Sequence, residues 1–340
     1  MKNESFNWGI IGGGGIARAF AIGLTELPDA KLLAVASQTP KRLLFMTERF
    51  SVPKQYSTYE ELIQDPDVDA VYVATTHNFH HDHTRLALEA GKPVLVEKPF
   101  TINAAQARNL IELAAEKEVA LLEAMWTRFL PAVVRLRQML AENIIGDVRM
   151  VKADFGIRPE LTPEHRLLNP KLGGGSLLDL GIYPISFSRM VFGKAPKRVN
   201  SQAYIGETGV DEQSSYLLEY EGGRAALLSS TCRMQMPMDA TIVGTKGYIY
   251  VPEFIHPQEL HIYPNNGELV IEKHPHPSSG LQYEAAALME CVREGKLESE
   301  VLPLAETLEI MELLDTIREQ WGLHYPDEGD DRLLDAETWR

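Results

Sequence analysis

The sequence lacks the features that mark several classes of protein. It contains only two cysteines, Cys232 and Cys291, which lie too far apart in the chain to form a CxxC pair. Neither a disulfide framework nor a zinc site is indicated, and both thiols are expected to be buried and inert. No uncharged apolar run approaches the roughly 18 residues that cross a bilayer, and the N-terminus carries no apolar signal segment. We therefore expect a cytoplasmic protein without a membrane partner.

Basic residues are also scarce. Lys and Arg total 33 against 48 Asp and Glu, a formal net charge of -15. Nucleic acid is not an expected partner, because no long basic run is present that could neutralise its phosphates. With 340 residues and 44% hydrophobic composition, the chain is long enough for two cores, since single domains usually divide beyond roughly 250 to 300 residues.

Up to residue 124, short apolar runs alternate with amphipathic segments. The apolar runs have the length of strands and cover residues 8–11, 31–36, 70–75, 94–96 and 119–122. The segments between them indicate helices at residues 16–27, 40–50, 59–64, 82–89 and 103–117. Gly91 suits the end of the fourth helix, and Thr101 or Asn103 can cap the fifth. This alternation predicts right-handed crossovers and a doubly wound parallel sheet over residues 1–124.

From residue 125 onward the pattern changes. Residues 125–143 indicate a long helix, followed by strand-like alternation that includes residues 148–156, 213–220 and 224–231. Turn sequences at residues 221–223, 245–247 and 264–267 favour hairpins. Two helices, at residues 281–294 and 304–321, close the chain. Residues 125–340 are therefore predicted to form an α+β domain with a large, mostly antiparallel sheet.

A run of glycines connects the first predicted strand to the first predicted helix. In this Gly-x-Gly-x-x-Ala pattern, Gly12 permits a tight turn, Gly14 lets the backbone approach a pyrophosphate, and Ala17 lets the helix pack on the strand. Gly15 and Ile16, at the junction of the loop and the helix, are predicted to contact the cofactor together with Gly12, Gly14 and Ala17, because the amides and dipole of a helix N-terminus favour an anion. The position in the first βαβ unit favours a Rossmann dinucleotide site over a merely structural turn.

The second predicted strand ends without the acidic residue that usually binds the ribose 2′-hydroxyl of NAD. Instead, Ser37 and Thr39 could hydrogen-bond a 2′-phosphate, and Lys41 and Arg42 could neutralise it. This composition favours NADP over NAD. The alternative, in which Lys41 and Arg42 are ordinary surface charges and NAD is used, stays open.

Three further segments follow predicted strands and should line the same crevice, namely residues 75–78, 97–99 and 123–126. Glu97 and Lys98 could instead be a solvated pair at a strand end. Four histidines lie within residues 75–83, and His77 and His81 have helical spacing. No metal is predicted, because the pattern lacks both a third ligand and the Glu of HExxH.

Three motifs together resemble one known family. The glycine loop, Glu97-Lys98-Pro99 and the segment Gly-Gly-Ser-Leu-Leu-Asp-Leu-Gly-Ile-Tyr at residues 174–183 are similar, in order and spacing, to its signatures. The family is that of glucose-fructose oxidoreductase, inositol dehydrogenase and the rhizopine-catabolism oxidoreductases, which use NAD(P). Residues 126–129, 181–183 and 244–247 are most similar to its dimeric dihydrodiol dehydrogenase branch.

The resemblance implies catalytic roles for three residues. Lys98 would reach the reacting oxygen of the substrate, Tyr183 would approach it from the second domain, and Asp179, one helical turn earlier, would orient them. Hydride transfer from a carbinol requires a base for the hydroxyl proton, and an ammonium beside a phenol stabilises phenolate. Without the resemblance, Tyr183 is equally consistent with a packed aromatic side chain. Many members of the wider family have His at this position.

The resemblance also implies cofactor contacts and partners. The cofactor-contacting residues would be Thr75, Thr76, His77, Asn78, His81, Glu97, Lys98, Trp126 and Arg128, with His77 in the place of a family proline. Trp126 and Arg128, together with Phe155 and Arg158, would line a pocket for a sugar, an anhydrosugar or a cyclic trans-diol. The open face of the second sheet would pair with a second copy, giving a homodimer or a dimer of dimers. The alternative function is a non-catalytic dinucleotide-binding sensor or scaffold.

Overall fold

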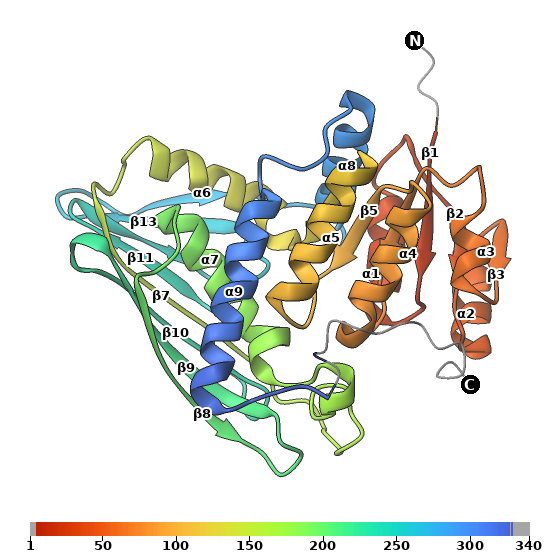
Figure 1. Cartoon of the computed structure of the whole chain (residues 1–340). Helices are drawn as coiled ribbons and strands as arrows, with labels where there is room; N and C mark the ends of the chain where they lie inside the picture. Colours follow the sequence, from red (N-terminus) through yellow and green to blue (C-terminus); the bar gives the residue numbers. More distant parts are fainter. Residues whose placement is uncertain (1–4, 327, 329–340) are drawn as a thin grey trace.

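The computed structural model describes residues 5–326 and 328 and contains two sheets, each associated with helices (Figure 1). The first sheet has six parallel strands in the order β3-β2-β1-β4-β5-β6. Its strands are β1 (Phe6–Ile11), β2 (Ala30–Ala36), β3 (Lys54–Tyr56), β4 (Ala70–Val73), β5 (Val94–Glu97) and β6 (Leu121–Ala124). The connecting helices are α1 (Gly15–Leu24), α2 (Pro40–Phe50), α3 (Tyr59–Ile63), α4 (His80–Glu89) and α5 (Ala104–Lys117). The predicted doubly wound sheet is confirmed.

The apolar strands of this sheet are buried because helices cover both faces. Every residue of β4 and β5 is buried. On one face, Phe20 of α1 stacks on Tyr72 of β4, with 3.8 Å between the ring centroids. Asn103 caps α5 by accepting a hydrogen bond from the backbone N–H of Gln106. The strand order reverses between β1 and β4, which opens a crevice at their carboxyl ends.

The structure differs from the sequence prediction at two places in this region. Strand β3 was not predicted, because three residues with mixed polarity show no recognisable period. The helix predicted over residues 125–143 is wrong: a 3₁₀ turn, Trp126–Phe129, is followed by a separate helix, α6 (Pro131–Ala141). Leu130 has φ -64° and ψ 142°, as expected of a residue before proline, which disfavours helical geometry there.

The second sheet has eight strands in the order β14-β13-β12-β11-β7-β10-β9-β8, and only β7 and β10 pair in parallel. Its strands are β7 (Val148–Gly156), β8 (Arg198–Ile205), β9 (Asp211–Tyr220), β10 (Arg224–Thr231), β11 (Ala240–Gly244), β12 (Gly247–Val251), β13 (Glu259–Pro264) and β14 (Val270–Lys273). The remaining helices are α7 (Ile182–Phe192), α8 (Gln282–Glu294) and α9 (Leu304–Trp321). The three predicted hairpin turns join β9 to β10, β11 to β12 and β13 to β14. The predicted, mostly antiparallel sheet is confirmed.

One face of this sheet packs against helices and the other carries exposed apolar side chains. Helices α6, α7 and α9 contact the sheet and lie on the same side of it (Figure 1). Because side chains alternate along a strand, Leu218 and Leu228 are buried beneath them. Leu217 and Leu227, directly opposite each other on β9 and β10, are 37% and 43% exposed. An apolar face is therefore open on this chain.

Helix α8 returns to the first sheet. Its Ala285 and Leu288 belong to the same hydrophobic core as Trp8 and Phe20, so this helix, which follows the second sheet in the chain, packs against the first. Cys232 and Cys291 are buried free thiols, as predicted. Within residues 5–326 and 328, no helix combines the length and apolar character required to cross a membrane.

Candidate active site

The glycine loop has the shape required for a dinucleotide. Gly12 has a φ of +110°, and a Cβ there would lie 2.5 Å from the carbonyl oxygen of Ala74, so only glycine fits this turn. By contrast, a Cβ on Gly14 or Gly15 would meet no atom within 4 Å. The loop is thus closed against β4 but open toward the crevice, where the N-terminus of α1 can hold a pyrophosphate.

A second feature suited to a nucleotide is a pocket between α1 and α2 of about 370 Å³. Its lining residues are Arg18, Lys41, Arg42, Leu44, Phe45 and Glu48. Arg18 places its guanidinium carbon 4.0 Å from the centroid of the Phe45 ring. Lys41 and Arg42 were predicted here, whereas Arg18 and Phe45 were not. The position of Arg18 in the first turn after the glycine loop was the available signal.

Ser37 and Thr39 do not line this pocket. The Ser37 side chain is buried, and its Oγ accepts a hydrogen bond of 3.3 Å from the backbone N–H of Thr39, the residue that precedes α2. The Ser37 hydroxyl is therefore occupied by the local turn. The positive charge at the pocket comes from the arginines and lysine, on an otherwise acidic chain.

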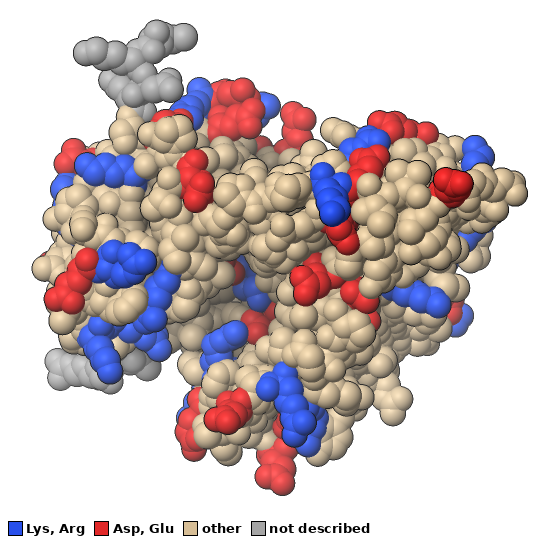
Figure 2. Space-filling model, turned by 180° about the vertical axis from the view of Figure 1, so that it is seen from behind, with Lys and Arg blue, Asp and Glu red and all other residues tan. Residues whose placement is uncertain are grey.

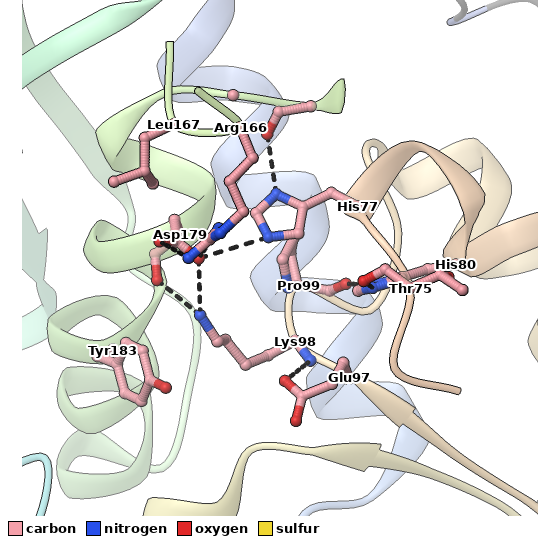
Figure 3. A network of polar contacts seen from close by, with 12 residues as sticks. Thr75, His77, His80, Glu97, Lys98, Pro99, Arg166, Leu167, Asp179 and Tyr183 are labelled. Carbon is pink, nitrogen blue, oxygen red and sulfur yellow. Dashed lines mark hydrogen bonds and ion pairs between the residues drawn. The ribbon is translucent and has the colours of Figure 1, made fainter. Parts of the chain in front are cut away.

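The three predicted catalytic residues come together across the two domains (Figure 3). Lys98 follows β5, and its Nζ donates to the backbone oxygen of Asp179 at 2.8 Å and to Asp179 Oδ1 at 3.1 Å. The same Nζ lies 4.8 Å from the centroid of the Tyr183 ring. All three side chains are largely buried. On the face seen in Figure 2, the surface is hollowed between the two halves of the molecule, with charged side chains inside the hollow.

An unusual helical turn presents Asp179 to the lysine. Residues Leu177–Gly181 form a π-helical turn that continues into α7. In the π register the Asp179 carbonyl would bond to the residue five positions later, which is Pro184 and has no N–H to donate. Lys98 Nζ donates to this oxygen instead. The Lys98–Pro99 peptide bond on the opposite side is cis.

The charges of this cluster determine its protonation. Burial opposes ionisation of Asp179, but the Lys98 ammonium and the other polar partners hold the pKa of Asp179 well below its usual value. Burial likewise opposes the charge on Lys98, yet Asp179 raises the pKa of Lys98 above its usual value. Burial raises the pKa of Tyr183, and the Lys98 ammonium acts in the opposite direction. Lys98 and Asp179 are therefore an ion pair beside a neutral phenol.

The histidines that follow β4 make different contacts, and only some of them reach this cluster. His77 Nδ1 lies 2.8 Å from the Gly173 carbonyl oxygen, and its Nε2 lies 3.4 Å from Asp179 Oδ1. Because a carbonyl only accepts, His77 Nδ1 carries the hydrogen. His81, predicted in the cofactor site, instead contacts Asp82 and Asn109 on the side of α5. His80, which was not predicted, lies 2.7 Å from the Pro99 carbonyl oxygen through Nδ1.

The other predicted residues of the loop after β4, Thr75, Thr76 and Asn78, are half-buried. Thr76 Oγ1 donates to Asn78 Oδ1 at 2.8 Å, which stabilises the 3₁₀ turn His77–Phe79. Thr75 Oγ1 lies 3.1 Å from His83 Nδ1. Within residues 5–326 and 328, no three His, Cys, Asp or Glu side chains are grouped as metal ligands.

The two residues of the segment after β6 that were predicted as cofactor contacts, Trp126 and Arg128, have different surroundings. Trp126 Nε1 donates to the Tyr183 hydroxyl at 2.9 Å and so belongs to the site. The Arg128 side chain is only 3% exposed and donates to Ser186 Oγ and to Glu306. The Arg128 guanidinium is therefore held in a buried ion pair within the second domain, and its predicted cofactor contact stays a prediction. The sequence carried no sign of this partner, 178 residues away.

Glu97 also points away from the crevice and belongs to a group of buried carboxyls. It accepts hydrogen bonds from the Tyr72 hydroxyl and the Lys98 backbone N–H. Burial raises the pKa of both Glu97 and Glu123 to about 7. Glu284 of α8 is fully buried, and neither of its carboxyl oxygens has a hydrogen-bond partner among the described residues. Glu97 therefore contributes to the interior behind the lysine.

Glu123→Gln is expected to reduce the loss of stability that the protein undergoes as pH rises. Because the folded pKa of about 7 exceeds the unfolded value, the carboxyl stabilises fully below about pH 4.5, and this stabilisation is lost as pH rises through 7. Gln stays neutral and can still accept from Thr307 Oγ1. Urea unfolding at pH 5 and pH 8 should show a smaller difference in the variant, by on the order of 3 kcal/mol. An equal difference in both proteins would contradict this, and exposed Glu112→Gln is the control.

Comparison with known proteins agrees with this geometry. Residues 6–125 match a family model described as "Oxidoreductase family, NAD-binding Rossmann fold", and residues 133–250 match the GFO/IDH/MocA C-terminal domain. A trans-1,2-dihydrobenzene-1,2-diol dehydrogenase of Xenopus laevis is 38% identical, covering 94% of this chain and 99% of that protein. The human enzyme of the same name is 35% identical, covering 95% and 98%.

Solved structures give the same result. A 3-ketoreductase from Actinomadura kijaniata, in complex with NADP and TDP-benzene, superposes with a TM-score of 0.83 at 26% identity. The match covers 93% of this chain and 98% of the ketoreductase. The predicted family is confirmed: the chain belongs to the Gfo/Idh/MocA family of NAD(P)-dependent oxidoreductases, enzymes that act on CH–OH groups.

Proposed function

We propose that this enzyme is an NADP-dependent oxidoreductase that interconverts a carbinol and a carbonyl on a small polyhydroxylated substrate. A sugar, an anhydrosugar or a cyclic trans-diol is the proposed class, supported by the names of its relatives, a trans-diol dehydrogenase and a 3-ketoreductase. The observation that carries the proposal is the meeting of Lys98 with Asp179 and Tyr183 across the domain boundary. We place that boundary between residues 124 and 125.

In the proposed reaction, Tyr183 transfers the proton and Lys98 stabilises the negative charge. When bound, the nicotinamide supplies the hydride acceptor or donor. In oxidation, the substrate hydroxyl gives its proton to the Tyr183 phenolate, and in reduction the Tyr183 hydroxyl returns a proton to the carbonyl oxygen. The Lys98 ammonium stabilises the negative oxygen in either direction, and Asp179 holds the ammonium in place. The Trp126 N–H fixes the Tyr183 oxygen.

The alternative is a non-catalytic dinucleotide sensor or scaffold. A sensor requires the glycine loop but gives no reason for a buried lysine, carboxylate and phenol in contact. Purified protein supplied with NADP and a panel of sugars and trans-diols should produce NADPH, followed by its absorbance. Nucleotide binding without turnover of any substrate, in oxidation or in reduction, would favour the sensor.

Arg42→Ala and Lys41→Ala are each expected to weaken binding of 2′,5′-ADP by about tenfold, because each removes a charge-assisted contact of about 1.4 kcal/mol to the 2′-phosphate. Arg18→Ala should have a similar effect, since Arg18 lines the same pocket. Calorimetric titration of the protein with 2′,5′-ADP and with ADP measures this selectivity. Arg49→Ala, on the same helix but outside the pocket, is the control. Equal loss for both nucleotides would argue against a 2′-phosphate site and for NAD.

We also propose a homodimer or a dimer of dimers, formed through the open face of the second sheet. Leu227→Glu with Leu217→Glu should reduce the mass measured by light scattering to that of one chain, because two carboxylates would be buried in the interface. Leu297→Glu, exposed elsewhere, should leave the mass unchanged. A single-chain mass for the unmodified protein would refute the interface.

The buried free thiols support a reducing, cytoplasmic location.

A further inference from the structure

Arg166 makes a two-point ion pair with the carboxylate of Asp179, and both residues belong to the second domain. Its Nη1 lies 3.0 Å from Asp179 Oδ1, and its Nη2 lies 3.0 Å from Oδ2. In Figure 3 the arginine reaches Asp179 from above and Lys98 reaches it from below. Such a two-point contact determines the orientation of the carboxylate plane, which a single hydrogen bond would leave free to rotate.

The loop that carries Arg166 is held tightly by the glycines that precede the π turn. The Gly175 N–H donates to the Leu167 carbonyl at 2.8 Å. A Cβ on Gly174 would lie 2.8 Å from the Arg166 carbonyl oxygen, so only glycine lets the backbone at residue 174 pack this closely against the backbone of Arg166. Leu167 is 2% exposed and anchors the turn. The triple-glycine segment is therefore a packed support for Arg166.

Arg166 also changes the electrostatic balance of the cluster. Two cations, Lys98 and Arg166, share one carboxylate, and the Arg166 charge lowers the pKa of both Lys98 and Asp179. The Asp179 side chain is 5% exposed and that of Lys98 is 11% exposed, whereas Arg166 is 46% exposed. Arg166 therefore lies at the solvent edge and can be replaced without opening the interior. The ionisable groups that face this cluster are His77, Glu97, Lys98, Arg166, Asp179 and Tyr183.

We propose that Arg166 is a positioning residue for the proposed proton-transfer reaction: its fork orients Asp179 so that Lys98 stands against Tyr183, and its charge offsets that of Asp179. The inference rests on the proposed function for its kinetic consequences. Its electrostatic consequence, a shift in the ionisation of Lys98, exists in the nucleotide-free protein and is independent of any substrate.

The test compares Arg166→Gln, Arg166→Lys and Arg166→Ala with Lys171→Gln, which removes an exposed positive charge of the same loop that is not paired with Asp179. Arg166→Gln should lower kcat by about 10- to 100-fold and leave KM within about threefold, because the residue acts through Asp179. The pH profile of oxidation should move upward by about one unit. Arg166→Lys should keep the position of the profile but restore kcat only in part, and methylguanidinium should partly rescue Arg166→Ala.

A second readout separates failure of this inference from failure of the proposed function. In nucleotide-free protein, the pH dependence of Lys98 acylation, followed by peptide mass spectrometry, should shift upward by about one unit in Arg166→Gln. If the parent enzyme turns over no substrate, the function fails and this shift alone decides the role of Arg166. Unchanged Lys98 labelling, or equal effects from Lys171→Gln, would overturn the inference.

Discussion

Lys98→Met is expected to lower kcat by about 10²- to 10⁴-fold in both reaction directions, because no other cation in the site contacts both Asp179 and the Tyr183 ring within the described residues. The side chain of Met has a similar length and no charge, so the negative oxygen of the transition state loses its stabilising partner. Binding of 2′,5′-ADP should change little, because the pocket that we propose for the 2′-phosphate lies between α1 and α2. Steady-state kinetics together with calorimetric titration would establish this difference.

The control for this variant must separate chemistry from folding. Removing Lys98 leaves Asp179 with Arg166 as its partner, so the fold should survive with a modest loss of thermal stability. Lys117→Met, on the exposed surface of α5, should leave both turnover and stability unchanged. Turnover within threefold of the parent in Lys98→Met would remove Lys98 from the proposed mechanism.

Tyr183→Phe is expected to lower kcat by about 10²- to 10³-fold and to abolish the pH dependence that the phenol imposes. Because burial raises the pKa of Tyr183, oxidation by the parent enzyme should accelerate as pH rises toward that pKa and the phenolate forms. Reduction needs the protonated phenol and should slow over the same range. In the variant, the rates of oxidation and of reduction should both lose this pH dependence, which pH profiles of kcat would show.

A second variant, at Trp126, tests the same role of Tyr183. Trp126→Phe removes the N–H that donates to the Tyr183 hydroxyl and should shift the profile to higher pH, since this hydrogen bond lowers the pKa of Tyr183. Tyr248→Phe, on the surface of the second sheet, should behave as the parent does. A Tyr183→Phe enzyme with an unaltered pH profile would assign the proton transfer to another group.

Much of the fold was predictable because its elements follow local periodicities. Strands β7 and β10 begin and end at the predicted residues, since alternating side chains mark a strand with one buried face. The errors arose where the pattern was too short, as in β3, or where Pro131 interrupted an otherwise helical pattern. Such a residue changes the backbone without changing the hydrophobic period.

The site was predicted less completely. Its motifs indicated that Lys98, Asp179 and Tyr183 would meet, and the structure brings them together, but nothing in the sequence distinguished His80 from His81, which are adjacent on α4. A rotation of about 100° per residue turns adjacent side chains to different sides of a helix. Arg128 was predicted from its place after β6, and only the structure shows its ion pair with Glu306.

The sequence by itself determined the glycine loop, the order of strands and helices in each half, and the chemical types of residue at the strand ends, because these depend on backbone sterics and neighbouring side chains. Only the tertiary structure decided which distant groups meet. Lys98 finds Asp179 81 positions away, and Arg166 finds the same carboxylate because packed glycines fold its loop back. The first contact follows from how the two domains pack against each other, and the second from how a loop of the second domain folds back, and no local pattern records either.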